Sequence, residues 1–183
     1  RNSGDSADQV EILLSAAYRA IENFENGFKE VEVIRKRARK ELGRHTASDN
    51  ICFDGVSRAA HVTDATDWRV EFPLVVLKPD YESEIPGLVK ACVELGLTII
   101  PRGGGTGYTG GAIPLYAMSA VINTEKLQDI GGVKAKKLPG LDREVSTIFT
   151  GAGVVTRRVS DAAEHAGLVF AVDPTSADAS CIG

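Results

Sequence analysis

The sequence has few of the residues that build disulfide frameworks or metal centres. Only three cysteines occur in 183 residues, at Cys52, Cys92 and Cys181, and the three histidines have no second ligand at metal spacing. This scarcity excludes a disulfide framework and a recognisable metal motif, and it favours a reducing compartment. We therefore expect no bound metal, and we assign none of the histidines to catalysis.

Long apolar runs and an excess of positive charge are also missing. No apolar stretch approaches the ~20 residues that a helix needs to cross a bilayer. The formal net charge is −4, which gives no reason to expect nucleic acid as a partner. With 43% hydrophobic residues the chain can bury one core, so the composition predicts a soluble domain, and we expect a cytoplasmic location.

Glycine, in contrast, is abundant and concentrated in residues 101–111. This segment reads PRGGGTGYTGG and follows the apolar run of residues 97–100. Glycine disfavours helix and strand, but it lets backbone N–H groups converge on a phosphate with no Cβ in the way. Arg102 adds positive charge, and Thr106, Tyr108 and Thr109 add hydroxyl groups. The segment predicts a cradle for a phosphate or pyrophosphate, with a plain surface loop as the alternative.

The residues after the glycines narrow the type of phosphate loop. No Lys-Ser or Lys-Thr pair is present, which excludes a Walker A loop. Gly105, Gly107 and Gly110 do form a G-x-G-x-x-G pattern, and Glu125 lies where a Rossmann fold places its ribose-binding acid. However, an apolar strand at residues 120–122 comes too soon to leave room for a crossover helix. A Rossmann-type nicotinamide-binding domain is therefore kept only as an alternative.

Strands and helices alternate on both sides of the glycine segment. Residues 75–77 predict a strand, residues 83–95 a helix capped by Ser83 and ended by Gly96, and residues 97–100 a parallel strand. Further along, residues 146–150, 156–166 and 168–172 predict strand, helix and strand. Residues 45–66 are interpreted as a connector. The glycine segment then lies at the carboxyl end of a strand, where ligands gather in α/β sheets.

The first 48 residues differ in kind and predict a helical arm. Ser6 and Gln9 form a capping box, and apolar residues then recur at helical spacing over residues 10–24 and 31–42, with a break at Asn26-Gly27. The basic run of residues 35–40 is interpreted as a solvated helix face rather than a site for nucleic acid or anionic membrane. Because the apolar stripes need a partner, a non-catalytic interaction module that docks through this arm is a second alternative function.

Four pieces of the sequence resemble one known family when they are taken in order. They are residues 75–79 (VVLKP), residues 101–107 (PRGGGTG), the triplet Gly151-Ala152-Gly153, and residues 173–183. This set resembles the FAD-binding domain of the vanillyl-alcohol oxidase and p-cresol methylhydroxylase (PCMH) family, in the branch of D-lactate dehydrogenases and the FAD subunit of glycolate oxidase. The resemblance implies an α+β, PCMH-type FAD-binding domain over residues 49–183, preceded by the helical arm of residues 1–48.

The resemblance also implies which residues contact the cofactor. The glycine loop would wrap the FAD pyrophosphate, and the segment before the last glycine would face the flavin side. Some family members attach the flavin to a histidine where this chain has Gly105, so we expect non-covalent FAD. The implied cofactor-binding residues are Arg102, Gly103, Gly104, Gly105, Thr106, Gly107, Tyr108, Pro174, Thr175, Ser180, Cys181 and Gly183.

The activity implied by the resemblance is oxidation of a small 2-hydroxy acid, such as D-lactate or glycolate, by a flavin-dependent oxidoreductase. The sequence reaches Gly183 inside the family's Ile-Gly-Gly motif. We therefore expect an incomplete FAD-binding domain that is inactive alone, with the substrate-facing residues in the C-terminal remainder of the parent chain, and we assign no catalytic residue. Any peripheral attachment to the inner membrane would come through that parent protein.

Overall fold

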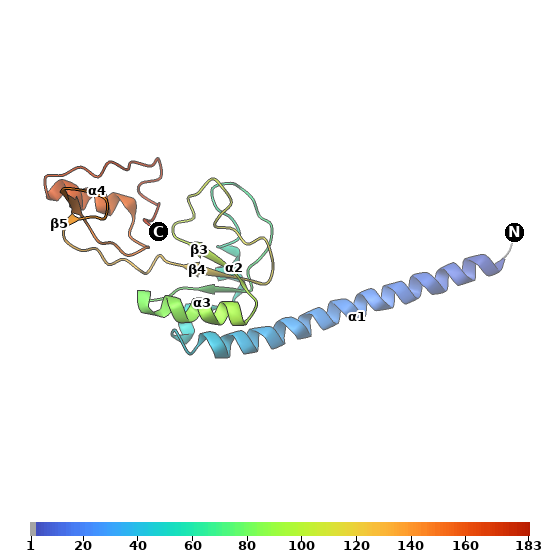
Figure 1. The fold of residues 1–183 in the computed structure, drawn as a ribbon. Coiled ribbons are helices and arrows are strands. Elements are labelled where there is room, and N and C mark those ends of the chain that lie inside the picture. Colours follow the sequence, from blue (N-terminus) through green and yellow to red (C-terminus); the bar gives the residue numbers. More distant parts are fainter. Residues whose placement is uncertain (1–2) are drawn as a thin grey trace. The chain divides into compact units, whose positions relative to one another are not determined.

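The computed structural model describes residues 3–183, with side chains from residue 8 onward, and divides into two compact units. The first unit extends to Lys40, and the second extends from Glu41 to Gly183. The described part of the first unit is helix α1 (Ser3–Leu42) without its last two residues, and the ribbon of α1 is unbroken in Figure 1. None of the helices in the described part of the chain combines the length and hydropathy of a membrane span.

The prediction of two helices separated at Asn26-Gly27 is wrong. A glycine inside a helix costs only about 1 kcal/mol relative to alanine, and the good helix formers on both sides offset it. The cap predicted at Ser6 lies outside the residues whose side chains are described.

A four-stranded sheet forms the centre of the second unit. Its strand order is β1 (Ile51–Cys52), β2 (Val75–Leu77), β4 (Ser119–Asn123) and β3 (Thr98–Arg102). β1 pairs antiparallel with β2, and the other pairs are parallel. All residues of β2 and β4 are buried, as expected for parallel strands covered on both faces. Val76, Val121 and Ile100 face one another across three strands and form the core of one face.

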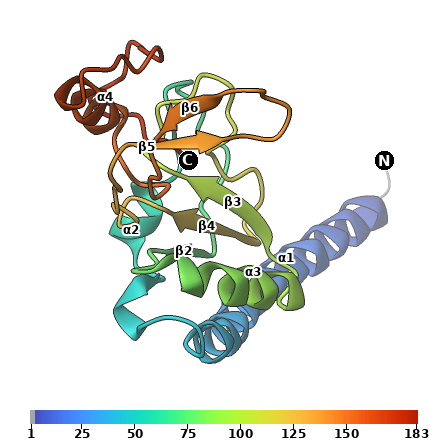
Figure 2. The same cartoon turned by 60° about the vertical axis from the view of Figure 1, so that its left-hand side comes forward.

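Helix α3 (Ile85–Glu94) follows the short 3₁₀ helix η2 (Glu82–Glu84) and packs beside the sheet (Figure 2). It buries Leu88, Ala91 and Cys92, and burial raises the pKa of the Cys92 thiol to about 11. Gly96 has a φ of +69° just past the helix end, as predicted. The cap predicted at Ser83 is wrong, because Ser83 lies within η2 and makes no capping hydrogen bond.

The neighbouring parallel strands β3 and β4 are connected by residues 103–118, which contain no helix. Parallel neighbours need a crossover of a dozen or more residues, and here the glycine-rich segment itself is that crossover. A Rossmann loop would instead open a helix. The described chain therefore lacks the element on which the nicotinamide alternative depends.

Beyond β4 the chain forms the hairpin β5 (Lys134–Lys137) and β6 (Glu144–Thr147), then helix α4 (Thr156–His165). Gly167, with a φ of +68°, follows α4 as predicted. The strand predicted at residues 146–150 lies slightly earlier, as β6. The strand predicted at residues 168–172 is wrong: no described strand offers that segment a backbone to pair with, and Val169 is 89% exposed.

The connector predicted at residues 45–66 contains three short elements that the sequence did not reveal. They are η1 (Ser48–Asn50), β1, and helix α2 (Gly55–Ala59), which is capped by a 2.8 Å hydrogen bond from the Ser57 N–H to Asp54 Oδ1. Elements of two to five residues are too short to show a hydrophobic period, so pattern alone does not reveal them.

Candidate functional site

Arg102 is the last residue of β3, and its side chain fixes the start of the glycine loop. Nη1 donates to the carbonyl oxygen of Thr63 at 2.7 Å and to that of Ala112 at 3.1 Å. The guanidinium thus joins the segment before β2 to the far end of the loop. Burial lowers the pKa of Arg102 from its ordinary value, whereas the nearby carboxyl group of Asp64 acts in the opposite direction.

The Arg102 guanidinium occupies the space next to the backbone of Gly105. Its φ is +65°, a conformation that favours glycine, and a Cβ at this position would overlap the Arg102 side chain. The sequence predicted a glycine here for close approach of a phosphate. The structure adds a second reason, because the space beside the backbone is already filled by Arg102.

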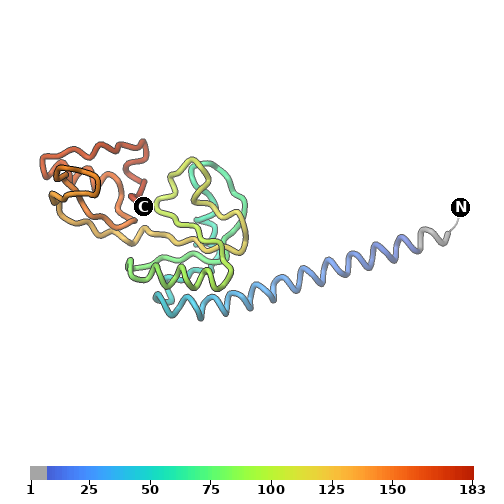
Figure 3. The backbone as a smooth tube through the Cα atoms, viewed as in Figure 1, coloured from blue at the N-terminus to red at the C-terminus, as the bar shows by residue number. Residues whose placement is uncertain are grey.

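Gly103 and Gly104 pack backbone to backbone against the last five residues of the chain. A Cβ on Gly103 would lie 2.7 Å from the carbonyl oxygen of Gly183 and 2.8 Å from Cys181 Cβ. A Cβ on Gly104 would overlap the Ala179 carbonyl. In Figure 3 the chain end, marked C, lies next to the glycine loop. The glycine loop and the segment around Ser180 and Cys181, both predicted as cofactor contacts, therefore lie together.

The C-terminal segment is held in place by the start of α4 and the turn before it. The Ser180 carbonyl accepts hydrogen bonds from the Thr156 backbone N–H at 2.8 Å and from Thr156 Oγ1 at 3.1 Å. The Gly183 N–H donates to the Ala152 carbonyl at 2.9 Å. Gly153 in turn packs against the Thr124 carbonyl, where a Cβ would not fit. The family-like Gly151-Ala152-Gly153 triplet is thus the bridge between β4 and the chain end.

The outer part of the glycine loop is open. From Gly105 to Tyr108, no backbone N–H donates a hydrogen bond to another residue of the described chain. A Cβ on Gly107 would meet nothing within 4 Å, and the Tyr108 side chain is 78% exposed. The loop therefore combines a fixed base with free N–H donors, which is the property that an anion cradle requires.

A small cavity of about 330 Å³ lies against the loop. Thr106 and Gly105 line it, together with Asp64 and Ser176. The predicted contacts Pro174 and Thr175 lie in the turn just before Ser176: the Pro174 carbonyl accepts a hydrogen bond from Ala177 N–H, and Thr175 is exposed. The structure gives neither of them a contact with the loop. Sequence analysis missed Asp64 and Ser176, whose proximity depends on the tertiary fold.

Asp64 is buried, with 9% of its surface exposed, and lies near the positive charge of Arg102. Burial alone would raise the pKa of its carboxyl group. Hydrogen bonds from Thr66 and from the Ala112 backbone, together with the charge of Arg102, more than offset that effect, so the pKa lies below its usual range. Asp64 is therefore an anion that balances Arg102 beneath the loop.

Cys181 faces the Gly104 backbone from the C-terminal segment. Burial raises the pKa of its thiol, and the Gly104 N–H acts in the opposite direction without cancelling the increase. The side chain is thus a neutral thiol packed on glycine, where two backbone segments approach closely.

A larger, mainly apolar cavity of about 1200 Å³ adjoins the base of the loop at Pro101 and Gly183. Side chains from α3, β3 and the segments before and after α4 line it; among them are Ile85, Val89, Ile99, Phe149 and Ile182. Sequence analysis missed this cavity because its lining comes from several segments that are far apart along the chain.

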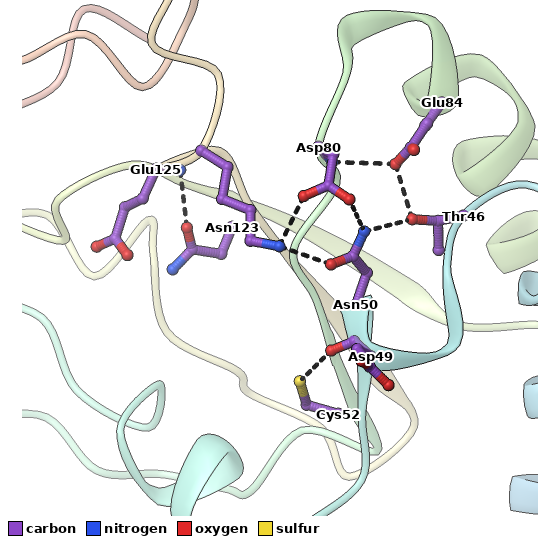
Figure 4. A network of polar contacts seen from close by, with 9 residues as sticks. Thr46, Asp49, Asn50, Cys52, Asp80, Glu84, Asn123 and Glu125 are labelled. Atoms are coloured by element: carbon purple, nitrogen blue, oxygen red, sulfur yellow. Dashed lines mark hydrogen bonds and ion pairs between the residues drawn. The ribbon is translucent and has the colours of Figure 1, made fainter.

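A polar network fixes the carboxyl end of β2 (Figure 4). Lys126 Nζ donates to Asn50 Oδ1 and to Asp80 Oδ1, each at 2.7 Å, and Asn50 Nδ2 donates to Asp80 Oδ2 at 2.7 Å and to Thr46 Oγ1 at 2.9 Å. The hydrogen bond from Lys126, which has the largest effect, and the hydrogen bond from Asn50 lower the pKa of the Asp80 carboxyl group. Both carboxylate oxygens of Asp80 are paired, so the network supports the fold rather than presenting a reactive group.

His61 has a similar structural role beneath the end of β4. Its Nδ1 lies 2.7 Å from the Ser57 carbonyl, and its Nε2 lies 2.9 Å from Asn123 Nδ2. The Asn123 Oδ1 atom accepts from the Glu125 N–H at 2.8 Å. Burial lowers the pKa of His61, so the ring is neutral, with Nδ1 as donor and Nε2 as acceptor.

The sequence matches one family model and several curated proteins. A family model described as an FAD binding domain matches residues 73–183, which is more than half of the chain. D-lactate dehydrogenase of Archaeoglobus fulgidus is 33% identical over 100 residues, which are 55% of this chain and 20% of that protein. Glycolate oxidase subunit GlcD of Bacillus subtilis is 27% identical over 151 residues, which are 82% of this chain and 30% of that protein. The chain thus spans less than a third of the length of either relative.

The fold has solved counterparts. A crystal structure of p-cresol methylhydroxylase with substrate bound superposes with a TM-score of 0.60 at 17% identity, over 80% of this chain and 28% of that one. The glycine loop, its closely packed C-terminal partner and the open N–H groups fit the cofactor of this family, FAD. The fold class predicted from the sequence is confirmed, and the chain belongs to the FAD-binding domain family, with a domain of the PCMH type.

Proposed function

We propose that this chain is the FAD-binding part of a flavin-dependent oxidoreductase that oxidises a small 2-hydroxy acid, with D-lactate and glycolate as the first candidates. The family match supports the cofactor, and the names of the two relatives support the substrate class. In this proposal residues 49–183 form the cofactor domain and residues 1–48 the helical arm. A cytoplasmic location remains a prediction.

The proposal rests on one property of the glycine loop. Its first residues are held in place, whereas the backbone N–H groups of its outer part are free to donate hydrogen bonds. Gly103 and Gly104 are fastened to the chain end, whereas the N–H groups from Gly105 to Tyr108 have no partner in the described chain. We assign the pyrophosphate to these N–H groups and the flavin side to the C-terminal segment. The residues assigned there are Pro174, Thr175, Ser180, Cys181 and Gly183.

When bound, FAD supplies the redox chemistry, because it accepts a hydride from the substrate carbon and passes electrons to an acceptor. In this proposal the residues of the glycine loop hold and position the cofactor through their backbone N–H groups. We propose that attachment is non-covalent, since Gly105 offers no nucleophile and Arg102 fills the space of a side chain there. Acid precipitation of the loaded protein should release all flavin into the supernatant, and flavin retained in the pellet would contradict this assignment.

A matched pair of variants tests the cradle. Gly107→Val adds a side chain where nothing lies within 4 Å, so the fold should tolerate it while the phosphate approach is blocked. Gly132→Val makes the same change at another open glycine, away from the loop. In a fluorescence titration of the 183-residue chain with FAD, we expect Gly107→Val to weaken binding at least about tenfold, or about 1.4 kcal/mol, and Gly132→Val to leave it unchanged.

Equal FAD affinity for the wild type and both variants would contradict the cradle, and failure of the wild type to bind FAD would contradict the proposed function itself. A separate assay addresses activity. We expect the FAD-loaded chain to show no turnover of D-lactate or glycolate above free flavin with an artificial electron acceptor, because the chain spans less than a third of the length of the relatives whose names suggest this activity. Turnover above that background would require catalytic groups within these 183 residues.

A further inference from the structure

Helix α1 carries an apolar stripe with a regular heptad repeat. Successive stripe residues alternate in spacing between four and three positions, which is the period of helices that pack along their length. The side chains up to Val31 are exposed, and Phe24 and Phe28 meet edge to face with ring centroids 4.8 Å apart. The stripe consists of Val10, Leu14, Ala17, Ile21, Phe24, Phe28 and Val31, and the next position of the repeat is the half-buried Arg35.

One flank of the stripe is also small or apolar. Leu13, Ala20, Gly27 and Ile34 precede stripe residues by one position, and they widen the apolar surface beyond a narrow seam. Leu13 and Ala20 are exposed, and Gly27 and Ile34 are half-buried. Such a wide, largely exposed surface on a single helix is typical of a helix that packs against another element. Gly27 and Ala20 would allow the backbone of that element to approach closely.

Charge is distributed unevenly along the same helix. Residues 8–25 contain four acidic side chains, Asp8, Glu11, Glu22 and Glu25, and one basic one, Arg19. Residues 29–40 contain six basic side chains and only two acidic ones. The first half of the helix is therefore negative and the second half positive.

We propose that α1 docks antiparallel on α1 of a second copy of this chain. In an antiparallel pair the acidic start of each helix, with Asp8 and Glu11, lies beside the positive half of the other, which favours association. A parallel pair would place like charges together and would stack Arg35 on Arg35 inside the seam. The uneven charge and the position of Arg35 therefore select one orientation of one partner.

The stripe is self-complementary in this orientation. A register that sets Ile21 opposite Phe24 of the second copy also sets Leu14 opposite Val31 and the small Ala17 opposite the large Phe28. Large residues thus face smaller ones along the seam, as packing without voids requires. Arg35 then lies near the start of the second helix, among its acidic residues. The distance along the helix from Val10 to Arg35 gives a seam of about 38 Å.

Analytical ultracentrifugation of the 183-residue chain tests the proposal, with Ile21→Asp and Ile12→Asp as a matched pair. Both isoleucines are exposed on α1, but only Ile21 belongs to the stripe. We expect the wild type and Ile12→Asp to sediment at twice the 19.4 kDa monomer mass, and Ile21→Asp to sediment as a monomer. A monomeric wild type at 100 µM, or equal association of the two variants, would overturn the proposal.

Two further measurements distinguish the orientation and guard against misfolding. Raising the NaCl concentration from 50 to 300 mM should weaken the antiparallel dimer, because salt screens the attraction between opposite charges. A dimer that tightens with salt would contradict the antiparallel arrangement. The thermal transition of the second unit should be equal in Ile21→Asp and Ile12→Asp, which would show that the loss of dimer is not a loss of fold. The outcome does not depend on FAD binding.

Discussion

At the scale of single residues, the glycine loop contains glycines that are needed for different physical reasons. Gly103 and Gly104 leave room for the chain end, and Gly105 combines a left-handed backbone with the volume occupied by Arg102. Gly107 has neither constraint, because open space surrounds it. Among these four glycines only Gly107 has no structural constraint, so we attribute its role to the ligand, and substitutions at these positions should separate stability from binding.

The coupling between Arg102 and Gly105 can be measured in a double-mutant cycle. Gly105→Ala should destabilise the protein by about 2–4 kcal/mol, since it imposes a left-handed alanine and displaces the guanidinium from the Thr63 and Ala112 carbonyls. In an Arg102→Ala background the same change should cost only about 1–2 kcal/mol, because only the backbone strain remains. Urea unfolding of the four proteins gives these free energies. Additive costs would show that the two residues do not share the space.

At the scale of elements, polar side-chain contacts hold together strands and turns that are too short to form many backbone hydrogen bonds. β1 has two residues and β2 three, yet the network of Asn50, Asp80 and Lys126 ties the segments around them to the turn that follows β4 (Figure 4). Such cross-links add to the few hydrogen bonds of the short strands, and they give the buried side chain of Asn50 the partners that it needs. The end of β2 and the end of β4 are thereby held at fixed positions below the loop.

Removing the lysine from this network should cost stability. Lys126→Met leaves Asn50 Oδ1 and Asp80 Oδ1 without their shared donor, and because the pair is partly exposed we expect a loss of about 1 kcal/mol. Lys90→Met is the control: Lys90 makes an exposed pair with Glu94 and should cost no more than about 0.5 kcal/mol. Guanidinium unfolding midpoints compare them, and equal losses would mean that the network contributes no more than a surface pair.

The elements also show how far the sequence could predict the fold. β2, α3 and α4 could be predicted from apolar runs, helical spacing and the glycines after the helices, and the glycine loop from composition alone. β1, α2 and β5 were missed because short elements depend on tertiary partners. Within the site, the contact between Gly104 and Ala179 joins residues 75 positions apart. Only the family resemblance, and no local pattern, could place those two segments together.

At the scale of the whole molecule, the stability of the second unit should depend on pH through His61. Burial holds its folded-state pKa below the ordinary value of 6.5. Between those two pKa values the unfolded chain binds more protons than the folded one, so stability rises with pH through this window and falls as pH drops below about 6.5. Protonation would also remove the acceptor that Nε2 offers to Asn123.

Urea midpoints at pH 7.5 and pH 5.5 test this dependence. The wild type should be less stable at pH 5.5, and His61→Gln, which has no titrating ring, should show a smaller difference between the two values. The carboxyl groups of Asp64 and Asp80 have lowered pKa values, so they stay ionised between pH 5.5 and pH 7.5. They therefore do not contribute to the change in stability over this range. An equal pH effect in the variant would exclude His61 as its source.

For the second unit we propose, above all, that the free N–H groups of the glycine loop receive the FAD pyrophosphate. The most direct measurement is an amide NMR titration of the ¹⁵N-labelled chain with FAD. We predict that the largest shift changes occur at residues 103–108, with further changes at residues 180–183, and that ADP reproduces the changes in the loop. Saturable FAD binding that leaves the amides of Gly105, Thr106, Gly107 and Tyr108 unshifted would contradict the account.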